Sequence, residues 1–148
     1  MLSRAGLLLL TICIAGCDGS GNLMPIDDVP PGQVTFHFKM HGDVSGVEDF
    51  RAATDDPSVI SAARAELLLP ESERRLFIIG PIDRGNGGSN LEWNWHFVSG
   101  QWMLTELAIE LCDGNAVLVS QDVDYWVDTV GQFCPWSSYV ASEVAAEP

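Results

Sequence analysis

The sequence predicts a single α+β domain with a mainly antiparallel sheet and two helices packed on one face. Several segments alternate apolar and polar residues with a period of two, which is typical of strands. Two other segments have helical spacing and begin after polar turn residues. The expected order is strands, helix, strand, hairpin, helix, strand, and a ferredoxin-like core is one arrangement compatible with it. We expect this domain to span residues 33–144 of the 148-residue chain.

The first half of the domain contains three strand candidates and one helix candidate. The strand candidates are residues 34–40, 47–53 and 76–80. Asp56 followed by Pro57 is a strong helix start, since an acidic side chain caps free N–H groups and proline suits the first helical turn. Pro70 should end this helix, because proline lacks the N–H that would continue it.

The most informative segment is an aromatic ribbon at the centre of the chain. Trp93, Trp95 and Phe97 alternate with polar residues, and the following Ser99-Gly100 suits a two-residue hairpin turn. Such a hairpin would place Phe97 opposite Trp102 and Trp95 opposite Leu104 on one aromatic face. We interpret this face as core rather than as an exposed platform for a sugar or peptide, because large exposed apolar patches are rare.

The continuation of the ribbon allows more than one structure. Leu107, Ile109 and Leu111 keep the period of two, so either both faces of the strand are covered or a bulge near Thr105 switches the register. A helix over residues 103–111 is the competing structure, because Leu104, Leu107, Ala108 and Leu111 fit helical spacing. A strand and a helix would both place Glu106 and Glu110 on one side.

The C-terminal part predicts a second helix and a final strand. The helix has an apolar stripe that ends at Gly131, a suitable C-terminal cap; the stripe consists of Val119, Val123, Trp126, Val127 and Val130. Residues 137–144 predict a strand, and residues 145–148 should fray.

Cys112 and Cys134 predict a disulfide. Of the four cysteines, Cys13 would be removed with a signal peptide and Cys17 would be lipidated, so these two remain as an even pair. The bridge would close a loop of about 22 residues and stabilise the fold by roughly 3 kcal/mol. A metal or redox thiol pair is less well supported, because the spacing is long and companion histidines are missing.

The charge of the chain excludes some partners. The chain has 7 Lys and Arg against 21 Asp and Glu, a formal net charge of −14. A nucleic-acid partner is not expected, because phosphate binding requires a basic surface. Direct adhesion to anionic lipid headgroups is disfavoured for the same reason.

The N-terminus has the pattern of a targeting signal. One basic residue, Arg4, precedes an apolar run that is too short to span a membrane but suits a signal peptide. The run ends in Ile14-Ala15-Gly16-Cys17, which resembles the bacterial lipobox. The resemblance implies a signal peptide over residues 1–16, a lipidated Cys17 that begins a flexible stalk over 17–32, and a location in the cell envelope facing the periplasm or exterior.

Polar residues near the ribbon are the candidate site. We predict that Trp95, His96, Glu106, Glu110 and Asp113 contribute to binding. A histidine with two carboxylates could also bind a metal or transfer protons. The sequence contains neither an HExxH helix nor a GxSxG elbow, so we predict no catalytic residue, no cofactor and no metal.

Two other polar patterns are better explained without a metal. His37 and His41 have a ligand-like spacing, but four strand steps would separate them by about 13 Å. Asp122, Asp124 and Asp128 resemble the start of a calcium loop, but Val127 stands where the loop requires glycine. We therefore predict that these three acids are solvated helix residues.

Three local signatures carry a family resemblance: Asn94-Trp95-His96, Glu110-Leu111-Cys112-Asp113-Gly114 and Cys134-Pro135-Trp136-Ser137-Ser138. Together they resemble a group of small bacterial secreted domains of unassigned function, sometimes labelled calmodulin-like. The resemblance implies a domain of about this size and implies no catalytic residue.

The sequence as a whole predicts a monomeric, lipid-anchored envelope protein that binds a protein, peptide or glycan and is not an enzyme. One alternative is a metal-dependent or acid/base hydrolase that uses His96, Glu106 and Glu110. Another is an inhibitor of envelope proteases, which the small size and the disulfide would permit.

Overall fold

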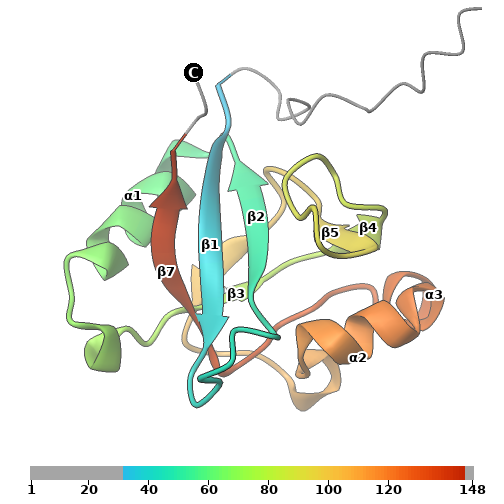
Figure 1. The fold of residues 1–148 in the computed structure, drawn as a ribbon. Coiled ribbons are helices and arrows are strands. Elements are labelled where there is room, and N and C mark those ends of the chain that lie inside the picture. Colours follow the sequence, from blue (N-terminus) through green and yellow to red (C-terminus); the bar gives the residue numbers. More distant parts are fainter. Residues whose placement is uncertain (1–31, 146–148) are drawn as a thin grey trace, which may run out of the picture.

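The computed structural model describes residues 32–145, with a three-stranded antiparallel sheet at the front of the view in Figure 1. This sheet has the order β2-β1-β7 and consists of β1 (Val34–Met40), β2 (Phe50–Thr54) and β7 (Ser138–Val144). The three strands agree with those expected from sequence. The proposed signal peptide and Cys17 lie outside the described residues.

Two smaller antiparallel sheets complete the β structure. They pair β3 (Phe77–Ile79) with β6 (Met103–Thr105) and β4 (Ile82–Arg84) with β5 (Trp95–Phe97). The α+β class with antiparallel sheets is confirmed. The ferredoxin-like arrangement is not confirmed, because the strands are distributed over three sheets.

The helical elements are short. They are α1 (Pro57–Leu67), η1 (Glu71–Glu73), η2 (Glu110–Cys112), α2 (Ala116–Gln121), α3 (Val123–Tyr125) and the π-helix η3 (Trp126–Val130). Helix α1 packs against β7, whereas α3 and η3 pack against β4 (Figure 1).

Helix α1 begins where the sequence indicated. The carboxylate of Asp56 accepts hydrogen bonds from the backbone N–H groups of Ser58 and Val59, at 2.8 and 3.4 Å, and Pro57 occupies the first helical position. Near the other end, the buried Glu66 carboxylate accepts from the N–H groups of Arg75 and Leu76. Glu66 therefore joins the end of α1 to the segment that leads into β3.

The predicted hairpin within the aromatic ribbon is wrong. β5 pairs with β4, so Trp95 lies opposite Arg84 and Phe97 opposite Ile82. The turn at Ser99-Gly100 is real, since Gln101 N donates to Val98 O at 3.1 Å. Gly100 has a φ of 70°, but no non-glycine residue in the described chain, Ser99 included, has a positive φ. This excludes the primed turns that match hairpin twist, and the chain instead crosses to pair β6 with β3.

The interpretation of the ribbon as core is confirmed. Trp95, Phe97 and Trp102 are all at most 2% exposed, while Trp93 and Leu104 are partly buried. The rings of Trp95 and Phe97 both pack on Phe133, with ring centroids 5.3 and 5.8 Å away. The Trp95 indole donates to Ala116 O and the Trp102 indole to Ala53 O.

The aliphatic row after the ribbon forms neither the long strand nor the helix expected. β6 ends at Thr105, whose hydroxyl exchanges hydrogen bonds with both backbone groups of Leu107. Local bonds of this kind compete with continued secondary structure. Leu107, Ile109 and Leu111 are consequently exposed, at 84%, 60% and 62%.

The C-terminal helix is interrupted at one residue. Asp122 has a non-helical backbone (φ −146°, ψ 63°) that separates α2 from α3, and its carboxylate accepts from Tyr125 N. Val119 and Trp126 of the expected stripe are buried. Gly131, with a φ of 77°, ends η3 as predicted, and its N–H donates to Trp126 O.

The predicted disulfide is confirmed. Cys112 and Cys134 are bonded, with their Cα atoms 5.1 Å apart, and both residues are fully buried. Cys134 N also donates to Cys112 O at 2.8 Å. The bridge therefore joins η2 to the segment that leads into β7.

Gly80 tests how tightly the core is packed. A Cβ atom at Gly80 would lie 2.6 Å from Trp102 Cβ and 2.7 Å from Trp102 Cα, so the backbone would have to move. We expect Gly80→Ala to lower the free energy of unfolding by about 1–3 kcal/mol, measured by urea denaturation. Gly114→Ala is the matched control, because its Cβ would meet only the edge of the Trp126 ring, at 3.1 Å. Equal losses in the two variants would contradict this view of the core.

Candidate functional site

The residues predicted to form a site are not assembled into one. Trp95 is fully buried in the core, which removes its ring from contact with a ligand. His96 Nδ1 lies 2.9 Å from Gly85 O, whereas Glu106 and Glu110 are exposed residues outside any hydrogen bond or ion pair with His96. Within residues 32–145, no group of three or more His, Cys, Asp or Glu side chains could hold a metal ion.

Asp113 has a structural contact near the disulfide. Its Oδ1 accepts hydrogen bonds from Gly114 N at 2.9 Å and Trp136 N at 3.0 Å. It therefore links the end of η2 to the start of the last segment, as the neighbouring bridge does.

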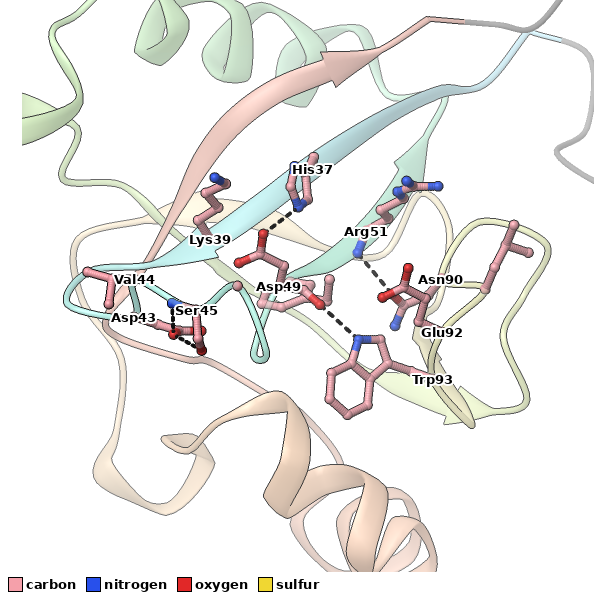
Figure 2. A pocket seen from close by; sticks show the side chains of 13 residues that line it. His37, Lys39, Asp43, Val44, Ser45, Asp49, Arg51, Asn90, Glu92 and Trp93 are labelled. Carbon is pink, nitrogen blue, oxygen red and sulfur yellow. Dashed lines mark hydrogen bonds and ion pairs between the residues drawn. The ribbon is translucent and has the colours of Figure 1, made fainter.

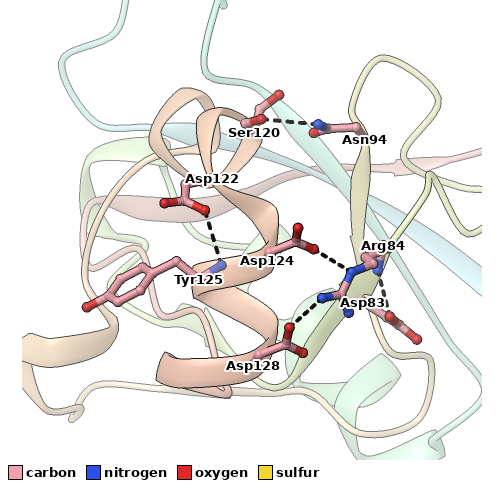
Figure 3. Close-up of polar contacts among 8 residues, drawn as sticks. All are labelled: Asp83, Arg84, Asn94, Ser120, Asp122, Asp124, Tyr125 and Asp128. Carbon is pink, nitrogen blue, oxygen red and sulfur yellow. Dashed lines mark hydrogen bonds and ion pairs between the residues drawn. The ribbon is translucent and has the colours of Figure 1, made fainter.

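Acidic residues of the C-terminal helices hold in place the hairpin formed by β4, β5 and the glycine-containing loop 85–94 between them (Figure 3). Arg84 donates to Asp124 at 2.7 Å and to Asp128 at 2.6 Å, and these bonds, that with Asp128 foremost, raise the pKa of Arg84. Asn94 adds a bond from its side chain to Ser120 O. Asp124 and Asp128 are exposed but paired, so the prediction of plain solvated acids is incomplete for them.

A pocket of about 520 Å³ lies on the side of the sheet where His37 and Arg51 project from β1 and β2 (Figure 2). Two loops enclose it, residues 43–49 between these strands and residues 90–93 before β5. Its polar lining includes His37, Lys39, Asp43, Asp49, Arg51, Asn90 and Glu92, and Trp93 supplies an indole.

The centre of the pocket is a histidine–aspartate pair. His37 Nε2 lies 3.0 Å from Asp49 Oδ2, and the two side chains are 27% and 18% exposed. The other oxygen, Asp49 Oδ1, is buried and has no hydrogen-bond partner among the described residues. A buried carboxylate oxygen without a donor is costly. Because Asp49 Oδ1 is shielded from solvent, a ligand N–H or O–H group could reach it only after this side chain turns.

The remaining walls are fixed by hydrogen bonds to the backbone. Asn90 Oδ1 accepts from Arg51 N, and Asn90 Nδ2 donates to Trp95 O, both at 2.9 Å. The Trp93 indole N–H donates to Asp49 O at 2.8 Å. These bonds fix the Trp93 ring at the Asp49 backbone before any ligand arrives.

Asp43 shapes the loop and is less available to a ligand. Its carboxylate accepts from the hydroxyl and N–H of Ser45 and from Glu48 N. These bonds, led by that of the Ser45 hydroxyl, lower the pKa of Asp43. By contrast, the side chains of Lys39, Arg51 and Glu92 line the pocket and form no hydrogen bond with other described residues, so they keep their donors and acceptors for a ligand.

The sequence contained part of the signal for this pocket. The period of two in β1 buries Phe36 and Phe38 and turns His37 and Lys39 to the opposite face. Asp49 was not predicted, because its approach to His37 depends on the antiparallel pairing of β1 with β2. His41 is separate from this pair and stacks on Tyr139.

The fold and the pocket define a small disulfide-bonded α+β domain with a pocket lined mainly by polar side chains. The family model of the BP-74 N-terminal domain matches residues 33–147, and the chain belongs to this family. Comparison with curated proteins and with solved structures finds no significant match. The expected membership in a family of small domains is thus confirmed, whereas the role of the three signatures in it stays a prediction.

No helix within the described part of the chain is long and apolar enough to cross a membrane.

Asn90 should couple the stability of the domain to the shape of the pocket. Asn90→Ala removes both side-chain bonds and leaves Arg51 N and Trp95 O without these partners. We expect a loss of about 2 kcal/mol in the free energy of unfolding, measured by urea denaturation. Asn94→Ala removes one exposed bond and should cost much less. A larger loss for Asn94→Ala would refute the role given to Asn90.

Proposed function

We propose that the chain is a lipid-anchored envelope protein whose domain binds a saccharide, without catalysis, in the pocket formed by His37, Asp49 and Trp93. The observation that carries this proposal is the partly exposed His37–Asp49 pair in a pocket whose indole, that of Trp93, is fixed by a hydrogen bond to Asp49 O. A binding site needs a few fixed polar groups in a hollow, and this pocket contains them.

Saccharide chemistry suits the lining of the pocket. Sugar hydroxyl groups both donate and accept, so they can use the carboxylates of Asp49 and Glu92 together with the cations of Lys39 and Arg51. The Trp93 ring offers an amphipathic surface near these groups. A peptide uses similar donors and acceptors and is the competing ligand class.

The absence of a catalytic role is supported by what surrounds His37. The Ser45 hydroxyl, which also lines the pocket, donates to Asp43 rather than to His37. A His–Asp pair acts in nucleophilic catalysis when a hydroxyl or thiol lies within hydrogen-bond reach of the histidine. Among the described residues, His37 forms its one polar side-chain contact with Asp49.

The anchor is supported by sequence alone. The apolar run and Ile14-Ala15-Gly16-Cys17 resemble a lipoprotein signal. Acyl chains on Cys17 would contribute about 0.8 kcal/mol for each buried methylene group, and the glycine- and proline-rich residues 17–32 would let the domain stand away from the bilayer. We expect Cys17→Ser to abolish incorporation of labelled palmitate and to release the protein from the membrane fraction. Retention of both properties would exclude lipidation at Cys17.

Binding should depend on the Asp49 carboxylate. A glycan array would identify saccharides that bind the wild-type chain, and titration calorimetry would measure the affinity. We expect Asp49→Asn, which preserves shape but removes the charge, to weaken binding by at least about tenfold.

Glu106→Gln is the matched control, because it removes one negative charge from an exposed residue outside the pocket. It should bind as the wild type does. A loss of binding in Glu106→Gln but not in Asp49→Asn would show that the site lies elsewhere. Binding to a peptide array with no response to any saccharide would refute the proposed ligand class.

A further inference from the structure

The few basic residues of this acidic chain fall into two groups. Within residues 32–145 they are Lys39, Arg51, Arg64, Arg74, Arg75 and Arg84. Arg64 is paired with Glu143, and Arg84 with Asp124 and Asp128. Among the described residues, the other four have no carboxylate at ion-pair distance. Lys39 and Arg51 line the pocket described above, and Arg74 and Arg75 line a second one.

The second pocket has a volume of about 330 Å³ and shares no lining residue with the first. Its polar side contains Arg74, Arg75 and His41. Its apolar side contains the buried Phe77 and the indole of Trp136, which is 43% exposed. Two arginines without a carboxylate partner among the described residues therefore line the same hollow as an accessible aromatic ring.

Arg74 is held in place without being neutralised. Its Nε donates to Leu69 O, and its Nη1 donates to Val140 O and Ala141 O, at 2.9–3.2 Å. All three partners are neutral carbonyl groups, so the full positive charge remains. A fixed guanidinium loses little conformational entropy when it binds an anion, which favours binding.

The neighbouring groups are also positioned. The His41 ring stacks on Tyr139 with centroids 4.3 Å apart, and His41 Nε2 lies 3.2 Å from Arg74 O. Burial, together with a hydrogen bond to Glu71, raises the pKa of Tyr139 to about 12, so its hydroxyl stays neutral. Trp136 follows the disulfide by two residues, and its N–H is bonded to Asp113.

The side chain of Arg75, unlike that of Arg74, is not fixed by contacts with other described residues. Its backbone N–H is bonded to Glu66, but its exposed side chain has no partner among the described residues. It can therefore move toward a ligand that Arg74 has already attracted, and replacing it removes no contact that the fold uses.

We propose that this second pocket binds a small organic acid, whose single carboxylate is held by Arg74 and Arg75 and whose ring-shaped body packs against Trp136. The Arg75 guanidinium group has no other partner among the described residues and can bind a carboxylate in a two-pronged geometry, while Arg74 has the N–H groups of Nη2 left to donate. The indole of Trp136 offers a face to the rest of the ligand. The net charge of −14 selects against phosphates and polyanions, because repulsion rises with each negative charge that a ligand carries.

The test follows the indole N–H resonance of Trp136 in the ¹⁵N-labelled full chain, assigned with Trp136→Phe. Benzoate and glucuronate present a carboxylate on an aromatic ring and on a sugar ring. Acetate presents the charge without a ring, and glucose presents a ring without the charge. We expect saturable shifts of the Trp136 resonance with benzoate, glucuronate or both, and not with glucose. Whichever of benzoate and glucuronate binds more tightly shows whether the ring of the ligand is aromatic or a sugar. Acetate should bind more weakly than that acid.

Two variants with the same change of charge show whether binding depends on the second pocket or on the overall charge of the chain. Arg75→Gln should weaken binding by about tenfold, while Arg51→Gln, in the first pocket, should leave it unchanged. Asp49→Asn should also leave it unchanged, which separates this site from the saccharide pocket. Equal weakening by Arg75→Gln and Arg51→Gln, or no shift of Trp136 with either acid, would overturn the proposal.

Discussion

The structure depends on burying the indole rings of Trp95 and Trp102 while both of their N–H groups keep a hydrogen-bond acceptor. Trp95 donates to Ala116 O and Trp102 to Ala53 O, so each buried ring joins two segments that are far apart in sequence. This matters because the strands of the two smaller sheets have only three residues each and supply few backbone hydrogen bonds. The disulfide at Cys112 and Cys134 closes the same region from the C-terminal side.

The same requirement explains why the pocket of His37 and Asp49 lies beside the core. Trp93 precedes Trp95 by two residues, and its N–H finds its acceptor at Asp49 O rather than in the interior. That bond holds the Asp49 backbone, while Asn90 is bonded to both Arg51 N and Trp95 O. One segment therefore provides the interior packing through Trp95 and a wall of the pocket through Trp93. Ligand affinity and core packing should consequently be difficult to change independently.

Local signals were sufficient for some elements and not for others. The period of two over β1, the Asp56-Pro57 helix start and the Gly131 cap all act within a few residues, and all were predicted. The pairing of β5 with β4 was missed because a ten-residue loop separates these two strands in the sequence. The turn type at Gly100, which prevents a hairpin between β5 and β6, was also not foreseen. The pocket of His37 and Asp49 was missed for a similar reason. His37 was visible on the outer face of β1, but its contact with Asp49 arises from pairing between strands, whereas the emphasis on His96 and Glu106 followed nearness in sequence.

The selectivity that we propose for the two pockets follows from the distribution of charge. Arg64 and Arg84 are used to join elements, and the remaining basic residues of the described chain lie at the two pockets. Each pocket is thus a small region of positive or mixed charge on a strongly acidic molecule. Long-range repulsion acts on every anion that approaches, while the short-range attraction of a pocket acts on one group at a time. A ligand that is neutral or carries one negative charge gains the local contacts at little long-range cost, whereas a polyanion is repelled before it reaches either site.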